Sequence, residues 1–115
     1  MHRGEVYWAD LNPRSGSEQQ GHRPVLLISN DGFNQAAGWK SLIVVPISAS
    51  TKQLRRSLTT VVIPSGIAGL SQESIALGHQ VTTLDKSKLH TPIGVLPSEL
   101  LGQVEQALKA AMNLP

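Results

Sequence analysis

Short runs of β-forming residues, separated by turn signals, fill most of the chain. Apolar or alternating runs occur at 5–11, 24–29, 41–47, 58–63 and 73–77, with a weaker extended stretch at 91–95. Proline, glycine, asparagine and serine lie between them, and these residues favour turns and strand ends. The pattern therefore predicts a mainly β chain. Pro46, near the end of the third run, predicts a bulge or a sheet edge there.

Helical periodicity is clear only in the last part of the chain. From residue 97 onward, apolar side chains recur at spacings of three and four, at Leu100, Leu101, Val104, Leu108, Ala111 and Met112. Pro97 and Ser98 stand where a helix begins, and Glu99 suits the positive end of the helix dipole. Short helical pieces are predicted at 30–38 and 85–89. Together these patterns predict an α+β fold, a small, strongly bent sheet or barrel capped by a C-terminal helix.

Length and composition narrow the class of protein. A chain of 115 residues fits one domain, 1–115, with one core and one site. It contains no cysteine, which excludes disulfides, thiolate metal sites and a cysteine nucleophile. No apolar run reaches the length of a membrane span, and the N-terminal residues lack the apolar core of a signal peptide. A cytoplasmic location is expected.

The charge is almost balanced overall but unevenly distributed. A net charge of +2 does not by itself indicate a nucleic-acid partner. Residues 1–60 hold seven basic and four acidic side chains, whereas 61–115 hold three and four. Part of the excess lies in a polar segment, 48–57, that is predicted to be a loop. A positive patch and an ordinary solvated surface account for this distribution equally well.

An arginine is fixed in front of the second predicted strand. Gly21 allows the chain to turn, and Pro24 pushes the residue before it toward extended geometry, so Arg23 enters the strand on a rigid approach. A guanidinium held in this way suits a phosphate, because its planar fork of donors matches the phosphate oxygens. An ion pair of Arg23 with Glu5 or Glu18 is the alternative interpretation.

Further polar residues follow other predicted strands. Ser48 comes after the run 41–47, and His79 and Gln80 come after the run 73–77. The four histidines lack metal-ligand spacing, so neither a metal nor a cofactor is predicted. Metal-free RNA cleavage needs a base for the 2′-hydroxyl, a cation for the phosphate and an acid for the leaving 5′-oxygen. A structural role for His79 and a turn-capping role for Ser48 stay open.

Several motifs, in order along the chain, resemble the MazF/PemK/Kid family of mRNA interferase toxins from bacterial type II toxin–antitoxin pairs. They are RGEVY at 3–7, GSEQQGHRPVL at 16–26, VVPIS at 44–48, QVTTLD at 80–85 and the C-terminal helix. The resemblance spans nearly the whole chain. It implies an SH3-like barrel, a homodimer, and sequence-specific, ribosome-independent, metal-independent cleavage of single-stranded mRNA to 2′,3′-cyclic phosphate and 5′-hydroxyl ends. It also implies a cognate antitoxin whose disordered acidic tail covers the RNA-binding surface.

The resemblance assigns roles to individual residues. Arg23 and His79 fall at catalytic positions, and Ser48 takes the place of a hydroxyl that is usually threonine. Several members have aspartate where this chain has His79, and one branch has a second arginine where this chain has Leu77, so the general base and acid are left open. RNA contacts are expected from Glu18, Gln19, Gln20, Lys52, Arg55, Arg56 and Gln80.

Two other functions fit the same fold. A related type of barrel toxin poisons DNA gyrase through protein contact and has no nuclease chemistry. An inactive RNA-binding relative is the second alternative, for which the missing second arginine is the best argument.

Overall fold

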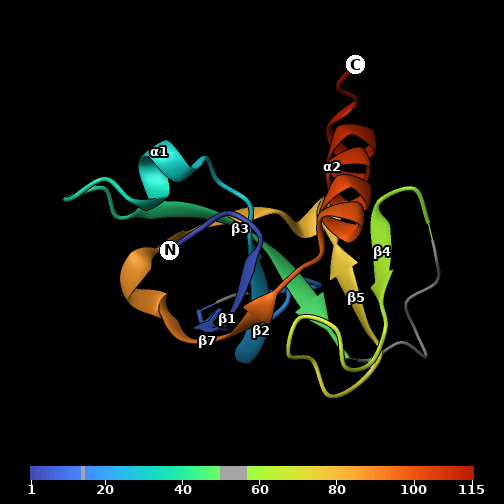
Figure 1. Ribbon diagram of the computed structural model, residues 1–115, viewed down its shortest axis with the longest axis horizontal. Coiled ribbons are helices and arrows are strands. Elements are labelled where there is room, and N and C mark those ends of the chain that lie inside the picture. Colours follow the sequence, from blue (N-terminus) through green and yellow to red (C-terminus); the bar gives the residue numbers. More distant parts are fainter. Residues whose placement is uncertain (14, 50–56) are drawn as a thin grey trace.

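The computed structural model describes residues 1–13, 15–49 and 57–115. Within these residues the chain forms seven strands, two α-helices and two short 3₁₀ helices (Figure 1). In chain order the elements are β1 (Glu5–Asp10), β2 (His22–Leu27), α1 (Asp31–Asn34), β3 (Ser41–Ser48), β4 (Thr60–Ile63), β5 (Ser74–Leu77), η1 (Gly78–Gln80), β6 (Thr82–Asp85), η2 (Lys86–Lys88), β7 (Leu89–Val95) and α2 (Ser98–Met112).

The strands form one bent antiparallel sheet in the order β4-β5-β3-β2-β1-β7, and β6 adds to β3 outside this path. Helix α2 packs beside β4 at one end of the sheet (Figure 1). The described part of the chain shows no pairing between β4 and β7, so the sheet stays open. The expected mainly β fold with a C-terminal helix is confirmed, but the barrel is not closed by hydrogen bonds.

Strand β3 is the centre of the sheet, and it changes partner along its length. On one side it pairs with β2; on the other it pairs first with β6 and then with β5. Ser41 lies opposite Asp85 and Ile47 opposite Ala76, so six steps along β3 correspond to nine along the facing chain. The three additional residues are η1 (Gly78–Gln80).

Pro46 lies where this change of partner occurs. Proline has no N–H to donate, and here no regular partner strand requires one. The prediction of a bulge or a sheet edge at Pro46 is therefore wrong: β3 is a central strand, its register with β2 is unbroken at Pro46, and the additional residues lie in the facing chain. Gly78 fits the same place for a steric reason, because a Cβ there would lie 2.7 Å from the carbonyl oxygen of Thr59.

Both faces of the sheet are covered, which gives two apolar clusters where one core was expected. Successive residues of a strand point to opposite faces. One face carries Val6, Leu26 and Ile47 and is covered by α2 through residues such as Val104. The other face carries a second cluster: Tyr7, Ala9, Leu11, Val25, Leu27, Leu42, Val44, Leu84 and Leu89. This explains why the central strands are continuous apolar runs rather than alternating ones.

Element boundaries differ from the predictions in several places, and the larger differences are these. Strand β2 starts at His22 rather than residue 24, and α1 is a single turn, Asp31–Asn34, rather than 30–38. Strand β4 begins at Thr60 because residues 57–60 form a turn, in which the Thr60 N–H donates to the Ser57 carbonyl. Strand β6 was not predicted, since its sequence TTLD has no clear periodicity and its pairing partner is distant in the chain. Most of the predicted loop 48–57 lies outside the described residues.

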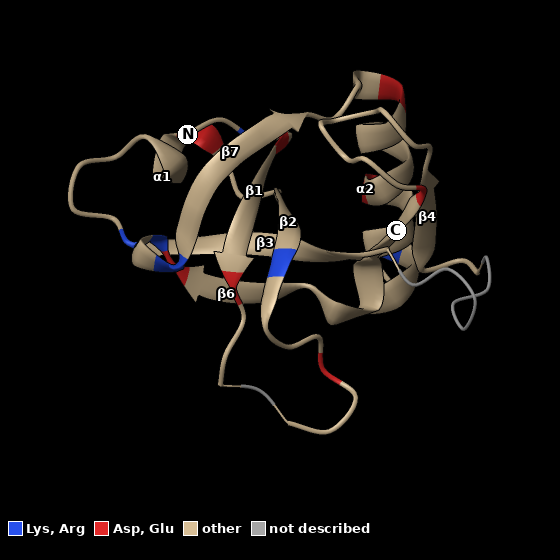
Figure 2. Ribbon diagram, turned by 90° about the horizontal axis from the view of Figure 1, so that it is seen from below, with Lys and Arg blue, Asp and Glu red and all other residues tan. Residues whose placement is uncertain are grey.

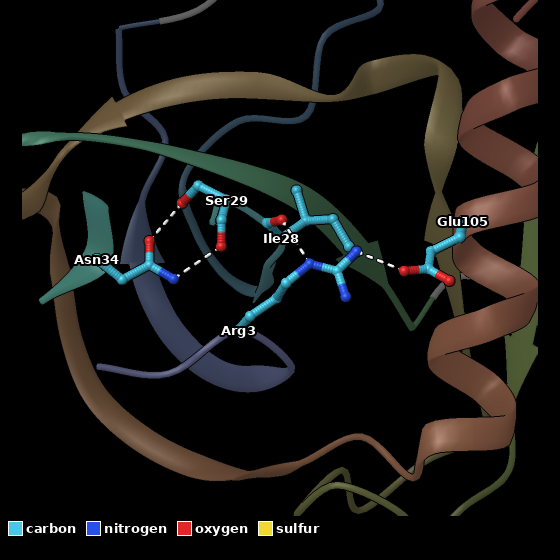
Figure 3. A network of polar contacts seen from close by, with 5 residues as sticks. All are labelled: Arg3, Ile28, Ser29, Asn34 and Glu105. Atoms are coloured by element: carbon cyan, nitrogen blue, oxygen red, sulfur yellow. Dashed lines mark hydrogen bonds and ion pairs between the residues drawn. The ribbon is translucent and has the colours of Figure 1, made fainter. Parts of the chain in front are cut away.

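Polar contacts tie the N-terminal arm to α2, next to a buried polar pair that joins the segment after β2 to α1 (Figure 3). The Arg3 guanidinium lies 2.7 Å from Glu105 of α2, and its Nε donates to the Ile28 carbonyl at 3.0 Å. Beside it, Ser29 and Asn34 form a buried pair in which the Ser29 hydroxyl donates to the Asn34 carboxamide. The Arg3–Glu105 pair is partly exposed, so it contributes about 1 kcal/mol or less, but it fixes α2 against the start of β1.

Candidate functional site

A cleft of about 320 Å³ opens where β3 changes partner. One wall is the tip of the loop between β1 and β2, and the other is η1 with the start of β6. The lining residues are Leu11, Ser17, Glu18, Gln19, Pro46, His79, Gln80, Val81 and Thr82. Four of the predicted site residues, Glu18, Gln19, His79 and Gln80, are therefore brought together from segments about sixty residues apart in the chain.

The Gln80 side chain holds the loop at the cleft. Its Oε1 accepts a hydrogen bond from the Gln19 N–H at 2.8 Å, and its Nε2 donates to the Ser17 carbonyl at 3.3 Å. A carboxamide has the same donor and acceptor as a peptide group, so one side chain satisfies both backbone groups of the loop. Gln80 was expected to contact RNA. In the structure its carboxamide is hydrogen-bonded to the backbone of the loop.

The base of the same loop is closed by three further hydrogen bonds. The Leu11 N–H donates to the Gly21 carbonyl at 2.9 Å, and the Gly21 N–H donates to Asn12 Oδ1 at 3.1 Å. Lys88 Nζ donates to the Asn12 carbonyl at 2.6 Å. Gly21 has a φ of +81°, which glycine adopts without strain. The loop is thus anchored at its base and at its tip, and it presents the exposed Glu18 at the cleft.

Arg23 lies near the cleft but does not line it. The side chain is exposed, and its Nε donates to the Gln20 carbonyl at 3.0 Å. Neither Glu5 nor Glu18 forms an ion pair with Arg23 in the described part of the chain, so the alternative interpretation of this arginine is not supported. Figure 2 shows the basic residue of β2 at the end of the strand from which the loop leaves.

Ser48 ends β3 and is buried, with 2% of its surface exposed. The β2–β3 ladder pairs Val25 with Pro46, and the same register extended by two residues sets Arg23 opposite Ser48. The predicted hydroxyl is therefore near the strand end that carries Arg23, but it is not on the open surface. Direct contact of the Ser48 hydroxyl with a ligand requires a local rearrangement.

His79 lies in η1 at the cleft, with an exposed side chain. Its Nδ1 is 3.5 Å from the Thr59 hydroxyl, which is the outer limit of a hydrogen bond. The imidazole is therefore exposed at the cleft, and its described hydrogen-bond contact is this long one. A purely structural role for His79 is thus supported by this one long contact with Thr59.

The remaining predicted residues are placed less fully. Gln20 is exposed, and its described contact is the carbonyl that receives Arg23. Lys52, Arg55 and Arg56 lie outside the described residues. In the ranges that are described, no cluster of three or more histidines and carboxylates is arranged to hold a metal ion. Among those same residues, no helix combines the length and apolar character needed to cross a membrane.

Two features of the site were not anticipated from the sequence. The backbone groups of Ser17 and Gln19 are fixed by a side chain about sixty positions away, and no local signal marks such a contact. Leu11 and Pro46 form apolar parts of the cleft, although their sequence context indicates only a strand end. Both features depend on the partner change of β3.

Comparison with known proteins identifies the family. The model of the PemK-like, MazF-like toxins of type II toxin–antitoxin systems matches residues 2–112. Endoribonuclease EndoA of Bacillus subtilis is 38% identical over 112 residues, which cover 97% of this chain and 94% of the relative. Endoribonuclease MazF of Staphylococcus saprophyticus is 35% identical over 114 residues, which cover 99% and 92%. The chain belongs to the PemK/MazF-like toxin family.

Solved structures show the same fold. The Mycobacterium tuberculosis toxin MazF-mt6 superposes with a TM-score of 0.79 at 22% identity, covering 96% of this chain and 98% of that one. A mycobacterial endoribonuclease in complex with its cognate antitoxin gives a TM-score of 0.78 at 24% identity, covering 98% and 95%. The open, bent sheet with a C-terminal helix is therefore the fold of these toxins.

Proposed function

We propose that this chain is the toxin of a type II toxin–antitoxin pair and an endoribonuclease that cleaves single-stranded mRNA at specific sequences, without a ribosome or a metal ion. The observation that carries the proposal is the cleft, which is lined by two groups able to carry a proton, Glu18 and His79, close to the strand end that presents Arg23. Relatives covering almost the whole chain are named endoribonucleases, which supports the same activity.

The proposed reaction uses the 2′-hydroxyl of the RNA as nucleophile. His79 or Glu18 removes its proton, and the 2′-oxygen forms a bond to the adjacent phosphorus. Arg23 stabilises the negative charge that builds on the phosphoryl oxygens. The bond to the 5′-oxygen then breaks, and that oxygen takes a proton from the acid. The products are a 2′,3′-cyclic phosphate and a 5′-hydroxyl, and no bond to water is made.

The two ends of the cleft suggest how the roles are divided. His79 is weakly held on its own side, whereas Glu18 lies on a loop anchored by Gln80, so both groups keep an exposed side chain at the cleft. We assign base chemistry first to His79, because an imidazole changes protonation near neutral pH. Ser48 is proposed to contribute its hydroxyl to the phosphate only after the rearrangement that its burial requires.

Cleavage of a long mixed-sequence single-stranded RNA in excess chelator tests this function. We expect cuts at a small set of sequences, with 5′-hydroxyl ends that a kinase labels directly and 3′ ends that resist a polymerase until the cyclic phosphate is removed. A strict need for a divalent ion would contradict the metal-free reaction. Intact RNA together with inhibition of gyrase supercoiling would instead support the protein-contact toxin.

We further propose two partners, a second copy of the chain and a cognate antitoxin with a disordered acidic tail, both in the cytoplasm. A shallow apolar groove between α2 and the β3–β6 pair, with the exposed Ile43 and Met112 on its rim, supports the dimer. The Ile43→Asp variant should lower the molar mass in light scattering toward that of one chain.

The proposed antitoxin tail should bind where RNA binds, so a peptide of its sequence should compete with RNA. Unchanged RNA binding at saturating peptide would show that the peptide and the RNA bind to different surfaces.

A further inference from the structure

A second hollow, of about 190 Å³, lies on the other face of the sheet from the cleft. The cleft contains Leu11 of one apolar cluster, whereas the hollow contains Ile47 and Leu70 of the other. Arg23 is next to both sites, because it lines the hollow while its Nε is bound to the loop that walls the cleft. A chain-like ligand held at Arg23 is thus able to occupy both sites.

One side of the hollow is an aromatic shelf formed by Trp8 and His22. The β1–β2 register pairs Trp8 with Pro24 and Asp10 with His22, so the two rings are diagonal neighbours on one face. Their centroids are 5.1 Å apart and their planes differ by 20°, which is a stacked arrangement. His90 of β7 packs on His22 at 5.8 Å and 48°. Backbone pairing and ring stacking therefore hold the shelf in place before any ligand arrives.

The lining of the hollow also includes groups that can recognise the edge of a planar ligand. The exposed Gln72 offers a carboxamide with both a donor and an acceptor, and Ser71 lies next to it. Ile47, Leu70 and Ile93 give the hollow an apolar floor. Among the described residues that line it there is no carboxylate, and Arg23 stands at its border. These features fit a flat, apolar-faced group that has a polar edge and is attached to a phosphate.

We propose that this hollow is a base-binding subsite, in which one nucleobase of the RNA stacks against the Trp8–His22 shelf while its phosphate reaches Arg23. The proposal rests on the endoribonuclease function proposed above and adds residues that select and position the substrate. Single-stranded RNA is recognised in this way generally, through unstacked bases held on aromatic side chains. Sequence specificity then comes from both faces of the sheet. Arg23 binds a phosphate of the RNA, the cleft binds the nucleotide on one side of that phosphate, and the hollow binds the nucleotide on the other side.

The test couples changes in the protein to changes in the RNA. The probe is an oligonucleotide that spans a mapped cleavage site, with a 2′-O-methyl group at the cut to prevent reaction, and with each base removed in turn. For the wild-type chain, loss of one particular base should weaken binding on the order of tenfold, the usual effect of one stacked base. In His22→Ala, loss of the same base should weaken binding little more. In His22→Phe, loss of that base should weaken binding as it does in the wild-type chain. His2→Ala, which removes an exposed histidine elsewhere, is the matched control.

Fluorescence gives a second measurement that does not depend on the His22 variants. The chain has two tryptophans, so Trp39→Phe leaves Trp8 as the reporter. Binding of the same oligonucleotide should quench Trp8, and the oligonucleotide that lacks the critical base should not.

Four results would overturn the proposal. One is an abasic effect that stays the same in His22→Ala at every position, and another is rescue by His22→Lys but not by His22→Phe, which would indicate a phosphate contact. The third is a His22→Ala variant that binds an antitoxin peptide more weakly but binds RNA as the wild-type chain does, which would make the hollow a binding site for peptide. In these three cases cleavage and the proposed function stand. Absence of RNA binding and cleavage by the wild-type chain would reject both.

Discussion

The side chain of Gln80 and the backbone of Gln19 are joined by a 2.8 Å hydrogen bond, and the second half of the same carboxamide reaches the Ser17 carbonyl. This pair connects the turn that follows β5 to the tip of the loop between β1 and β2. The position of Glu18 at the cleft thus depends on a residue on the opposite wall. The two walls of the cleft act as one unit.

Gln80→Ala should lower cleavage although the chain still folds. The variant loses two hydrogen bonds worth about 1 kcal/mol each, so the melting temperature should fall by roughly 5 to 10 °C. The loop tip loses its anchor, and kcat/KM should fall on the order of tenfold because Glu18 is no longer held in place. Gln106→Ala, at an exposed position of α2, is the control. Equal cleavage by Gln80→Ala and Gln106→Ala would show that the anchor has no catalytic value.

Arg23→Ala should fold normally and lose most of its activity. The side chain is exposed, so its removal leaves the core intact, whereas losing one positioned charge from a phosphoryl transition state costs on the order of 3 kcal/mol. Arg23→Lys should recover only part of the rate, because a point charge does not reproduce the planar fork. Single-turnover cleavage measures both variants against Lys109→Ala, which removes an exposed charge from α2. Near-normal rates in both Arg23 variants would place the phosphate elsewhere.

The pH profile tests His79 as the base. A base acts in its deprotonated form, so the single-turnover rate should rise with pH and level off once the imidazole has lost its proton. His79→Asn should remove this rise and lower the rate, while His79→Asp should restore part of the rate with a midpoint at lower pH. Thermal melting of the same variants provides the control. A lower melting temperature with an unchanged pH profile would make His79 structural and pass the base role to Glu18.

Tyr7 gives the fold a dependence on alkaline pH. Burial, and then the hydrogen bond to Glu5 and the negative charge of that carboxylate, raise the pKa of Tyr7 from 10.0 to about 12. The protonated phenol is thus favoured in the folded state, and its contribution to stability is complete below pH 10 and is lost as the pH rises toward 12. Tyr7→Phe should show a smaller loss of unfolding free energy across this window, measured by urea titration. An equal loss in both proteins would exclude Tyr7 as the cause.

Local sequence patterns were sufficient for the elements that carry their own signal. The apolar run before Pro46 and the three-and-four spacing from Leu100 to Met112 predict β3 and α2 because burial determines both the pattern and the structure. Strand β6 has no such signal: Thr82 and Thr83 become a strand only because β3 offers them a partner forty residues away in the chain. Its existence is a property of the sheet rather than of its own residues.

The sequence was sufficient to predict which residue types form the candidate site, but not how those residues are buried and which of them contact one another. The proline that follows Arg23 and the polar residues after β5 indicated chemistry at strand ends, and the cleft does join His79 to the Glu18 loop. The sequence did not indicate that Ser48 is buried or that the Gln80 carboxamide is used by the loop. Nor did it place Trp8 against His22, because ring stacking between two strands depends on their register.

The three residues of η1, which separate β5 from β6, make the sheet less regular but form part of the candidate site. If residues 78–80 were absent, β5 and β6 would share a single register on β3 and form one continuous strand, with a longer ladder of hydrogen bonds. The same deletion would remove His79, the anchor of the loop and one wall of the cleft. Selection for a more regular sheet therefore acts directly against the site, as expected where function depends on a local irregularity. This segment is the place where stabilised variants of the toxin should prove least active.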